Sequence, residues 1–219
     1  MRLGKLMMIV LIVSLMLTAA GCSKTYFFDF TEEVDLVRDD GTWSSFGNPV
    51  VLSDNGLFMA ANWIAVPHVY SGNLTATVRF DLDTDQDNYV PYFEVYLSAK
   101  NGFSNSQGYA GISFYNVGQD TAFYNIYHSN SSEGTTNYLE SQTPIPGIDT
   151  VGLNTLVIEQ RGGILTFWLN DAFIVAFNPS RYNVDLYCLN IQSTQDSQKS
   201  CLFYRDVKIE YEGTRELIP

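Results

Sequence analysis

Carboxylates recur at every second position of one short stretch. These are Asp81, Asp83, Asp85 and Asp87, and Asn88 follows them. Closely spaced oxygen ligands in a loop can hold Ca²⁺. The spacing approaches that of an EF-hand loop, but Asn88 stands where such a loop needs glycine, and we expect strands rather than helices on both sides. A Ca²⁺ site of irregular geometry is therefore one hypothesis, and a solvated acidic turn is the other.

A second group combines aromatic rings with charged side chains. Alternate residues of a strand point to the same side, so Tyr92, Glu94 and Tyr96 are expected to share an outward face. The same outward parity on other expected strands adds Arg79, Tyr115 and Trp168. Sugars stack their C–H faces on such rings, and the charged groups hydrogen-bond hydroxyls. If the strands lie in one concave sheet, the group forms a binding platform; otherwise its members pack under loops or on the convex face.

The first 21 residues are typical of an export signal. Arg2 and Lys5 precede the apolar run Leu6–Leu17, which is too short to span a bilayer as a helix. The small residues that follow end at Cys22 and resemble the lipobox of bacterial lipoproteins, although Ala19 stands where that family prefers leucine. The resemblance implies cleavage directly before Cys22 and acylation of this residue with palmitate or related chains.

Acylation of Cys22 would anchor the protein stably to a membrane. Ser23 follows the cysteine, which resembles the pattern of lipoproteins sent to the outer membrane where the host has one. The alternative is secretory cleavage near Ala20, with Cys22 left as a thiol. Loss of Arg2 and Lys5 with the signal would change the formal charge from −12 to −14. So acidic a chain is repelled by nucleic acid, and we expect no nucleic-acid partner.

Two cysteines remain beyond the signal. An even pair in an exported protein predicts a disulfide between Cys188 and Cys201. In the chain-entropy model, closing this loop contributes about 3 kcal/mol. The two residues have opposite parity on their expected strands, whereas cross-strand partners share a face, so the bond would require a bulge. The alternative is two buried thiols.

The rest of the chain contains no convincing amphipathic helix. Short aromatic and β-branched runs alternate with turn clusters about every ten residues, which is typical of a β-sandwich or barrel. Residues 155–177 predict a meander of three strands with tight turns at 162–163 and 170–171. The 14 Phe, 14 Tyr and 3 Trp suffice to fill a core. We expect a tether at 22–25, one all-β domain at 26–213 and a C-terminal tail at 214–219.

Several segments resemble the concanavalin A-like lectin/glucanase jelly roll, a family that includes laminin-G-like domains. They are the opening strand at 27–30, a long strand at 72–80, a glycine-containing strand at 109–114, the hairpin at 154–171 and a closing strand at 203–209. The resemblance implies a two-sheet antiparallel jelly roll that buries alternate aromatic residues. Members of this family bind glycans, cleave β-glucans or bind proteins, so the fold leaves the function open.

Catalysis has little support in the sequence. Glucanases of this family carry Glu-x-Asp-x-x-Glu on one strand, because retaining hydrolysis needs two carboxylates about 5 Å apart. Here Glu94 has tyrosine at both positions two residues away. His68 and His128 occur without a nucleophile motif and are expected in loops or turns. We expect a membrane-anchored envelope lipoprotein with a non-catalytic jelly roll that binds carbohydrate. The alternatives are a protein-binding or structural envelope module and, less favoured, a divergent glycoside hydrolase.

Overall fold

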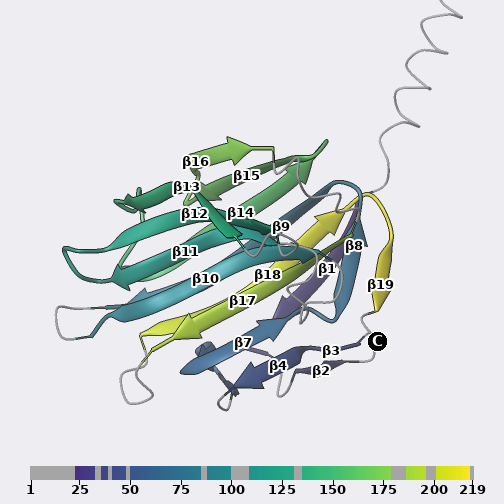
Figure 1. Ribbon diagram of the computed structural model, residues 1–219. Helices are drawn as coiled ribbons and strands as arrows, with labels where there is room; N and C mark the ends of the chain where they lie inside the picture. The colour runs from purple at the N-terminus through teal and green to yellow at the C-terminus, as the bar shows by residue number, and fades with distance from the viewer. Residues whose placement is uncertain are drawn as a thin grey trace, which may run out of the picture.

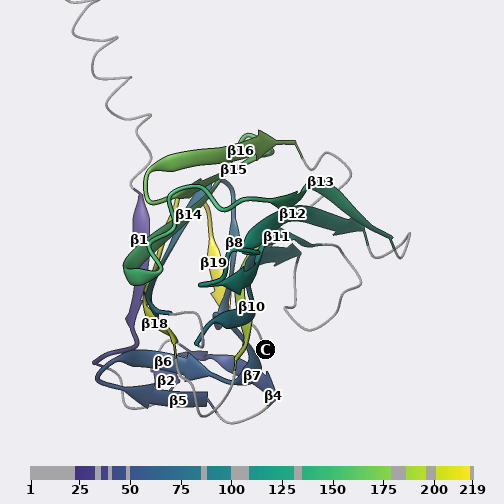
Figure 2. The same cartoon turned by 90° about the vertical axis from the view of Figure 1, so that its left-hand side faces the viewer.

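The computed structural model describes residues 23–32, 36–38, 41–47, 50–84, 88–99, 109–130, 135–178, 186–195 and 201–217. Within these ranges the chain forms two antiparallel sheets packed face to face, as Figures 1 and 2 show. The predicted all-β sandwich is therefore confirmed. No helix within the same ranges is long and apolar enough to cross a membrane. The predicted signal and Cys22 lie outside the described residues.

One sheet has eight strands. Its order is β16 (Ala172–Phe177), β15 (Ile164–Leu169), β14 (Val151–Arg161), β9 (Leu74–Asp83), β18 (Leu202–Tyr211), β6 (Gly56–Met59) and β5 (Val50–Ser53), and β1 (Lys24–Asp29) also pairs with β18. We call the outer surface of this sheet the back face. The predicted opening and closing strands, β1 and β18, are neighbours, as the sequence suggested.

The other sheet has nine strands. Its order is β13 (Thr135–Thr143), β12 (Phe123–Asn130), β11 (Tyr109–Val117), β10 (Val90–Ala99), β17 (Leu186–Thr194), β7 (Ala61–Ala65) and β4 (Ser44–Gly47). β8 (His68–Ser71) pairs with β17 and with β19 (Arg215–Leu217), which completes the nine strands. β2 (Val37–Arg38) and β3 (Gly41–Thr42) form a separate two-stranded sheet. Residues expected in the C-terminal tail thus contribute β19, which extends the nine-stranded sheet.

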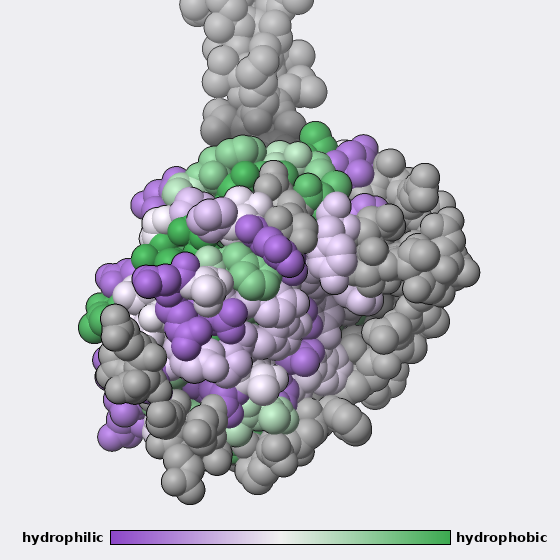
Figure 3. Space-filling view, turned by 60° about the vertical axis from the view of Figure 1, so that its left-hand side comes forward, coloured by the Kyte–Doolittle hydropathy of each residue, from purple (hydrophilic) through white to green (hydrophobic). Residues whose placement is uncertain are grey.

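The predicted meander is present as β14, β15 and β16. Its first turn uses Gly162 and Gly163 at φ of +56° and +80°, which glycine adopts without steric cost. Its second turn places Asn170 and Asp171 at positive φ as well, a conformation that these two residue types tolerate. β16 ends the sheet. Apolar surface gathers at the top of Figure 3, at the height where Figure 1 shows β15 and β16.

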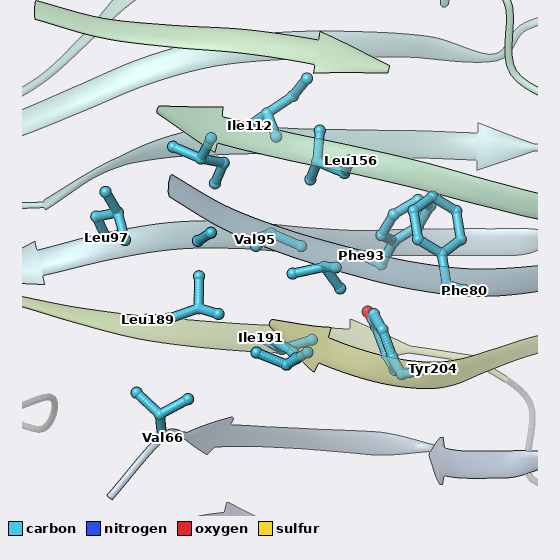
Figure 4. Packing of buried hydrophobic residues seen from close by; sticks show 14 of the residues in the cluster. Val66, Phe80, Phe93, Val95, Leu97, Ile112, Leu156, Leu189, Ile191 and Tyr204 are labelled. Atoms are coloured by element: carbon cyan, nitrogen blue, oxygen red, sulfur yellow. The ribbon is translucent and has the colours of Figure 1, made fainter. Parts of the chain in front are cut away.

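The core lies between the sheets and follows strict alternation along the long strands. On β9, every second residue from Leu74 to Leu82 is buried, and on β10 the predicted inward residues Phe93, Val95 and Leu97 are buried as well. Phe80 from one sheet contacts Phe93 from the other edge-on, with ring centroids 5.2 Å apart. Figure 4 shows such side chains from both sheets pointing toward one another. The residues between these core positions therefore point to the outer faces of the two sheets.

The predicted disulfide between Cys188 and Cys201 is wrong, because both residues are buried thiols. Cys188 lies within β17 of the nine-stranded sheet, where its Sγ approaches the carbonyl oxygen of Val66 at 3.6 Å. Cys201 precedes β18 of the other sheet and lies beside Gln195, to whose side chain its amide donates at 3.3 Å. The extended chain from 188 to 195 covers about 20 Å, whereas a disulfide needs Cα atoms within about 7 Å.

Candidate functional site

Three rows of side chains cross the outer surface of the nine-stranded sheet. Each row consists of directly opposed cross-strand partners, and neighbouring rows lie about 7 Å apart along the strands. The central row is polar: Trp63, Gln192, Glu94, Ser113 and Asn125. The row on one side is Thr194, Tyr92, Tyr115 and Phe123. The row on the other side is Asn190, Tyr96, Gly111, Tyr127 and Tyr138.

These rows enclose a hollow of about 330 Å³. Its lining comes from five adjacent strands, β10 to β13 and β17, and we call this part of the surface the hollowed face. The lining side chains are Tyr92, Glu94, Tyr96, Tyr109, Ser113, Tyr115, Tyr127, Tyr138 and Gln192. Six tyrosines therefore surround a centre that carries a carboxylate, a hydroxyl and an amide.

The rings on either side of the central row contact one another. On one side, Tyr92 and Tyr115 have centroids 5.1 Å apart, and Tyr115 lies nearly parallel to Phe123 at 4.8 Å. On the other side, Tyr109 contacts Tyr96 at 5.7 Å and Tyr127 at 5.5 Å. Rings that support one another in this way hold their orientation before a ligand arrives. The central polar row is thus bordered by two preformed aromatic walls.

Glu94 lies at the centre of the polar row. Tyr127 Oη donates to its Oε2 at 2.8 Å, and Tyr92 is a second hydrogen-bond partner. Burial raises the pKa of Glu94 above its ordinary value, while the hydrogen bonds with Tyr92 and Tyr127 oppose that rise. Burial, followed by the nearby charge of Glu94, also raises the pKa of Tyr127. An ionised carboxylate offers about four acceptor positions, so Glu94 retains acceptor capacity toward the hollow.

Two further contacts fix the wall at Tyr96. Trp63 Nε1 donates to Tyr96 Oη. Gly111 lies directly opposite Tyr96 on β11, and a Cβ atom there would collide with the Tyr96 Cβ and come within 2.7 Å of the Val95 carbonyl oxygen. The missing side chain at 111 therefore lets Tyr96 pack close to the sheet.

Solved structures of carbohydrate-active proteins share this two-sheet arrangement. The CBM2 module of the evolved Dit from Lactobacillus casei BL23 phage J-1 has a TM-score of 0.61 at 14% identity, over 88% of this chain and 98% of its own. The endo-β-1,3-glucanase from Pyrococcus furiosus has a TM-score of 0.55 at 10% identity, over 85% and 93%. The Crh5 transglycosylase in complex with NAG has 0.53 at 13% identity, over 85% and 83%. The fold is a jelly roll.

The likeness is one of fold, because the identities are low. No family model and no curated protein matches the sequence of this chain. The chemistry of the jelly roll must therefore be argued from its own side chains.

Four of the six predicted ligand-binding residues meet in the hollow of this jelly roll: Tyr92, Glu94, Tyr96 and Tyr115. Sequence reasoning missed Tyr109, Ser113, Tyr127, Tyr138 and Gln192. Tyr109 and Ser113 share the parity of Tyr115 on one strand, so that signal was present for two of them. For the other three, the order of strands in the sheet was needed as well.

Arg79 and Trp168 are not part of the hollow. They lie on β9 and β15 of the eight-stranded sheet, so the expectation that all six residues share one face is wrong. Arg79 Nε donates to both carboxylate oxygens of Asp206, at 2.9 and 2.8 Å. Trp168 contacts Phe173 edge-on, with centroids 6.4 Å apart. Both side chains belong to the back face.

The predicted Ca²⁺ ligands fall partly outside the described residues, as Asp85 and Asp87 do. Asp81 forms an ion pair with Arg205 Nε at 3.1 Å, and Asp83 is exposed. Among the residues that the structure describes, no cluster of three or more His, Cys, Asp or Glu side chains could hold a metal ion. The Ca²⁺ site stays a prediction.

The two histidines lie in strands, not in the loops or turns expected from the sequence. His68 is buried on β8 and contacts Tyr26 edge-on at 5.1 Å. His128 lies on β12 near Phe177. Neither residue lines the hollow.

Proposed function

We propose that the hollowed face binds a carbohydrate and does not cleave it. The observation that carries this proposal is the convergence of six tyrosines with Glu94, Ser113 and Gln192 around one hollow. Tyrosine combines a flat apolar ring with a hydroxyl, which suits a ligand whose faces carry C–H groups and whose edges carry hydroxyls. Similar folds occur in proteins described as carbohydrate-binding modules and glucanases, which agrees with this assignment.

The central row supplies the hydrogen bonds that such a ligand needs. The Glu94 carboxylate accepts, while the Ser113 hydroxyl and the Gln192 amide both donate and accept. Their cross-strand pairing sets these groups side by side on neighbouring strands, so binding needs little rearrangement of the backbone.

The number of carboxylates in the hollow favours binding over hydrolysis. Retaining hydrolysis places two carboxylates about 5 Å apart across the scissile bond. Among the described side chains that line the hollow, Glu94 is the sole carboxylate. The positions two residues away on its strand, which share its face, are Tyr92 and Tyr96. A second carboxylate is therefore missing from this set where a glycosidase of this architecture needs it.

Thermal melting tests the carbohydrate proposal. The full-length protein is purified in a detergent without a sugar headgroup and melted against a panel of oligosaccharides. A sugar at 100 times its Kd raises the free energy of unfolding by about 2.7 kcal/mol, which gives a visible rise in Tm. Tyr96→Ala should abolish that rise. If no sugar shifts the Tm, carbohydrate binding is contradicted and a protein ligand becomes the favoured function.

We also propose that the protein is an envelope lipoprotein anchored through Cys22. The support is the signal-like sequence at 1–21 and the small residues before Cys22. The first strand begins at Lys24, so the sandwich would lie close to the membrane surface. Labelling of cells with a palmitate analogue tests this: the label should be incorporated and should disappear in Cys22→Ala. Equal labelling of both proteins would contradict lipidation of this residue.

A further inference from the structure

We propose that the hollow accepts glycans without negative charge and rejects anionic glycans, with Glu94 as the residue that excludes them. The anionic class comprises sugars with carboxylate, sulfate or phosphate groups. This inference rests on the proposed carbohydrate binding and specifies the ligand class of the same site.

The distribution of positive charge is the first observation. The five strands that line the hollow, β10 to β13 and β17, contain neither lysine nor arginine. The described cationic side chains of the sheets lie elsewhere. They are Lys24, Arg79, Arg161, Arg205 and Lys208 in the eight-stranded sheet, and Arg215 on β19. Recognition of a carboxylate, sulfate or phosphate group generally relies on arginine or lysine, and the described side chains that line the hollow include neither.

The partners of Glu94 are the second observation. Carboxylates on the back face have cationic partners: Asp206 pairs with Arg79, and Asp81 pairs with Arg205. Glu94 instead accepts from Tyr127 and interacts with Tyr92. Phenol donors orient a carboxylate but leave its charge uncompensated. The negative charge of Glu94 therefore acts on whatever enters the hollow.

The position of Glu94 determines how strongly it repels an anionic ligand. It is the middle residue of the central row, between Gln192 and Ser113, so a ligand in the hollow lies close to it. Two negative charges about 6 Å apart at an effective dielectric constant of about 20 repel strongly enough to weaken binding roughly 100-fold. Hydroxyl and ammonium groups, by contrast, donate to the same carboxylate. The favoured ligands are thus neutral sugars and sugars with a free amine.

Matched pairs of oligosaccharides test the inference. The members of a pair differ at C6 alone, which carries a hydroxymethyl group in one and a carboxylate or sulfate in the other. Calorimetry on the full-length protein, in a detergent without a sugar headgroup, gives the ratio of the two Kd values. We expect the neutral member to bind about tenfold tighter or more. Glu94→Gln should reduce that ratio at least about tenfold, even though loss of the carboxylate acceptor also weakens binding of the neutral member. Glu159→Gln, on the back face beside Arg161, should leave the ratio unchanged.

A titration of the wild-type protein provides a second readout if Glu94→Gln does not fold. The titratable groups that act on Glu94 are Tyr92 and Tyr96 on β10, Tyr127 on β12 and Tyr204 on β18. Burial raises the pKa of each of these tyrosines, so all stay neutral in acid. A sulfate remains charged in acid whereas Glu94 becomes protonated. The preference for the neutral member of a sulfated pair should therefore shrink as pH falls.

The possible results separate the two proposals. Equal or tighter binding of the anionic member in the wild-type protein overturns the charge selection but leaves carbohydrate binding standing. An unchanged ratio in a folded Glu94→Gln variant overturns the role of Glu94. If neither member of any pair binds, the proposed carbohydrate function itself is overturned, and this inference with it.

Discussion

The two outer faces of the sandwich carry similar side chains in different arrangements. On the back face, carboxylates and guanidinium groups neutralise one another, as in the pairs of Asp206 with Arg79 and Asp81 with Arg205. On the hollowed face, Glu94 instead has hydroxyl partners, Tyr127 and Tyr92, from the two flanking rows. Ion pairing thus satisfies these polar groups of the back face internally, whereas on the hollowed face Glu94 keeps acceptor capacity and has no cationic side chain among its described hydrogen-bond partners.

The aromatic residues differ between the faces in the same way. The rings of the hollowed face contact their neighbours across three strands, β10, β11 and β12. On the back face, Trp168 and Phe173 form an edge-on pair, and Phe173 is 60% exposed. This pair lies on β15 and β16, and within the described residues β16 is the last strand of the sheet. On the hollowed face, by contrast, the rings border the hydrogen-bonding groups of the central row.

The largest effect on stability is expected on the back face. Asp206 is 3% exposed and accepts two hydrogen bonds from Arg79. Asp206→Ala removes these charge-assisted bonds, and we expect a loss of about 2–3 kcal/mol in the free energy of unfolding. Urea denaturation measures it. Sugar binding by the folded variant should equal that of the wild-type protein, and a parallel loss of affinity would show that the two faces are not independent.

The sharpest contrast in binding comes from one ring on each face. Tyr115 contacts both Tyr92 and Phe123 in a wall of the hollow, and Tyr115→Ala should weaken sugar binding by about 2 kcal/mol, roughly 30-fold, as truncation of a central aromatic residue does. Trp168→Ala is the matched control and should leave Kd unchanged. Calorimetry with the best ligand measures both. The opposite ranking of the two variants would move the site to the back face.

Gly111→Ala should reduce both the stability of the protein and its affinity for sugar, each by a smaller amount than the variants above. The new methyl group would collide with the Tyr96 Cβ, and the Val95 carbonyl oxygen would be 2.7 Å away. Because backbone atoms cannot yield easily, we expect a loss of about 1–2 kcal/mol in stability. Displacement of Tyr96 from its wall should also weaken sugar binding. Unchanged stability together with unchanged affinity would show that the strand accommodates the methyl group.

The sequence predicted which side of each strand a residue faces, and this part of the site was correct. Tyr92, Glu94 and Tyr96 share one strand, and Tyr115 lies on the next strand, which pairs directly with it. Parity and a local pairing are enough to place these four together. The alternation of Phe93, Val95 and Leu97 toward the core follows from the same period.

The sequence could not predict which sheet each strand joins. Arg79 has the expected outward parity, but β9 pairs with β14 and β18, which lie far from it in sequence. The same difficulty explains why the predicted disulfide between Cys188 and Cys201 is wrong, because the chain crosses from one sheet to the other after β17. Such assignments depend on long-range pairing and on how the two sheets close over a common core, and no local pattern encodes them.

The smallest predicted effect concerns how pH changes stability through Glu94. Burial raises the pKa of this carboxyl in the folded state above its ordinary value of 4.5, so the folded protein binds more protons than the unfolded chain in this range. The contribution of Glu94 to the free energy of unfolding is therefore largest below the ordinary pKa. It declines as pH rises through the pKa of this carboxyl in the folded state. Glu94→Gln lacks this titration.

The stability of the Glu94→Gln variant relative to wild type should accordingly increase as pH rises above the ordinary pKa of 4.5. Urea denaturation of both proteins at several pH values measures the difference. A constant difference for Glu94→Gln would mean that the hydrogen bonds with Tyr92 and Tyr127 fully offset its burial. The charge of Glu94 would then not lower the free energy of unfolding.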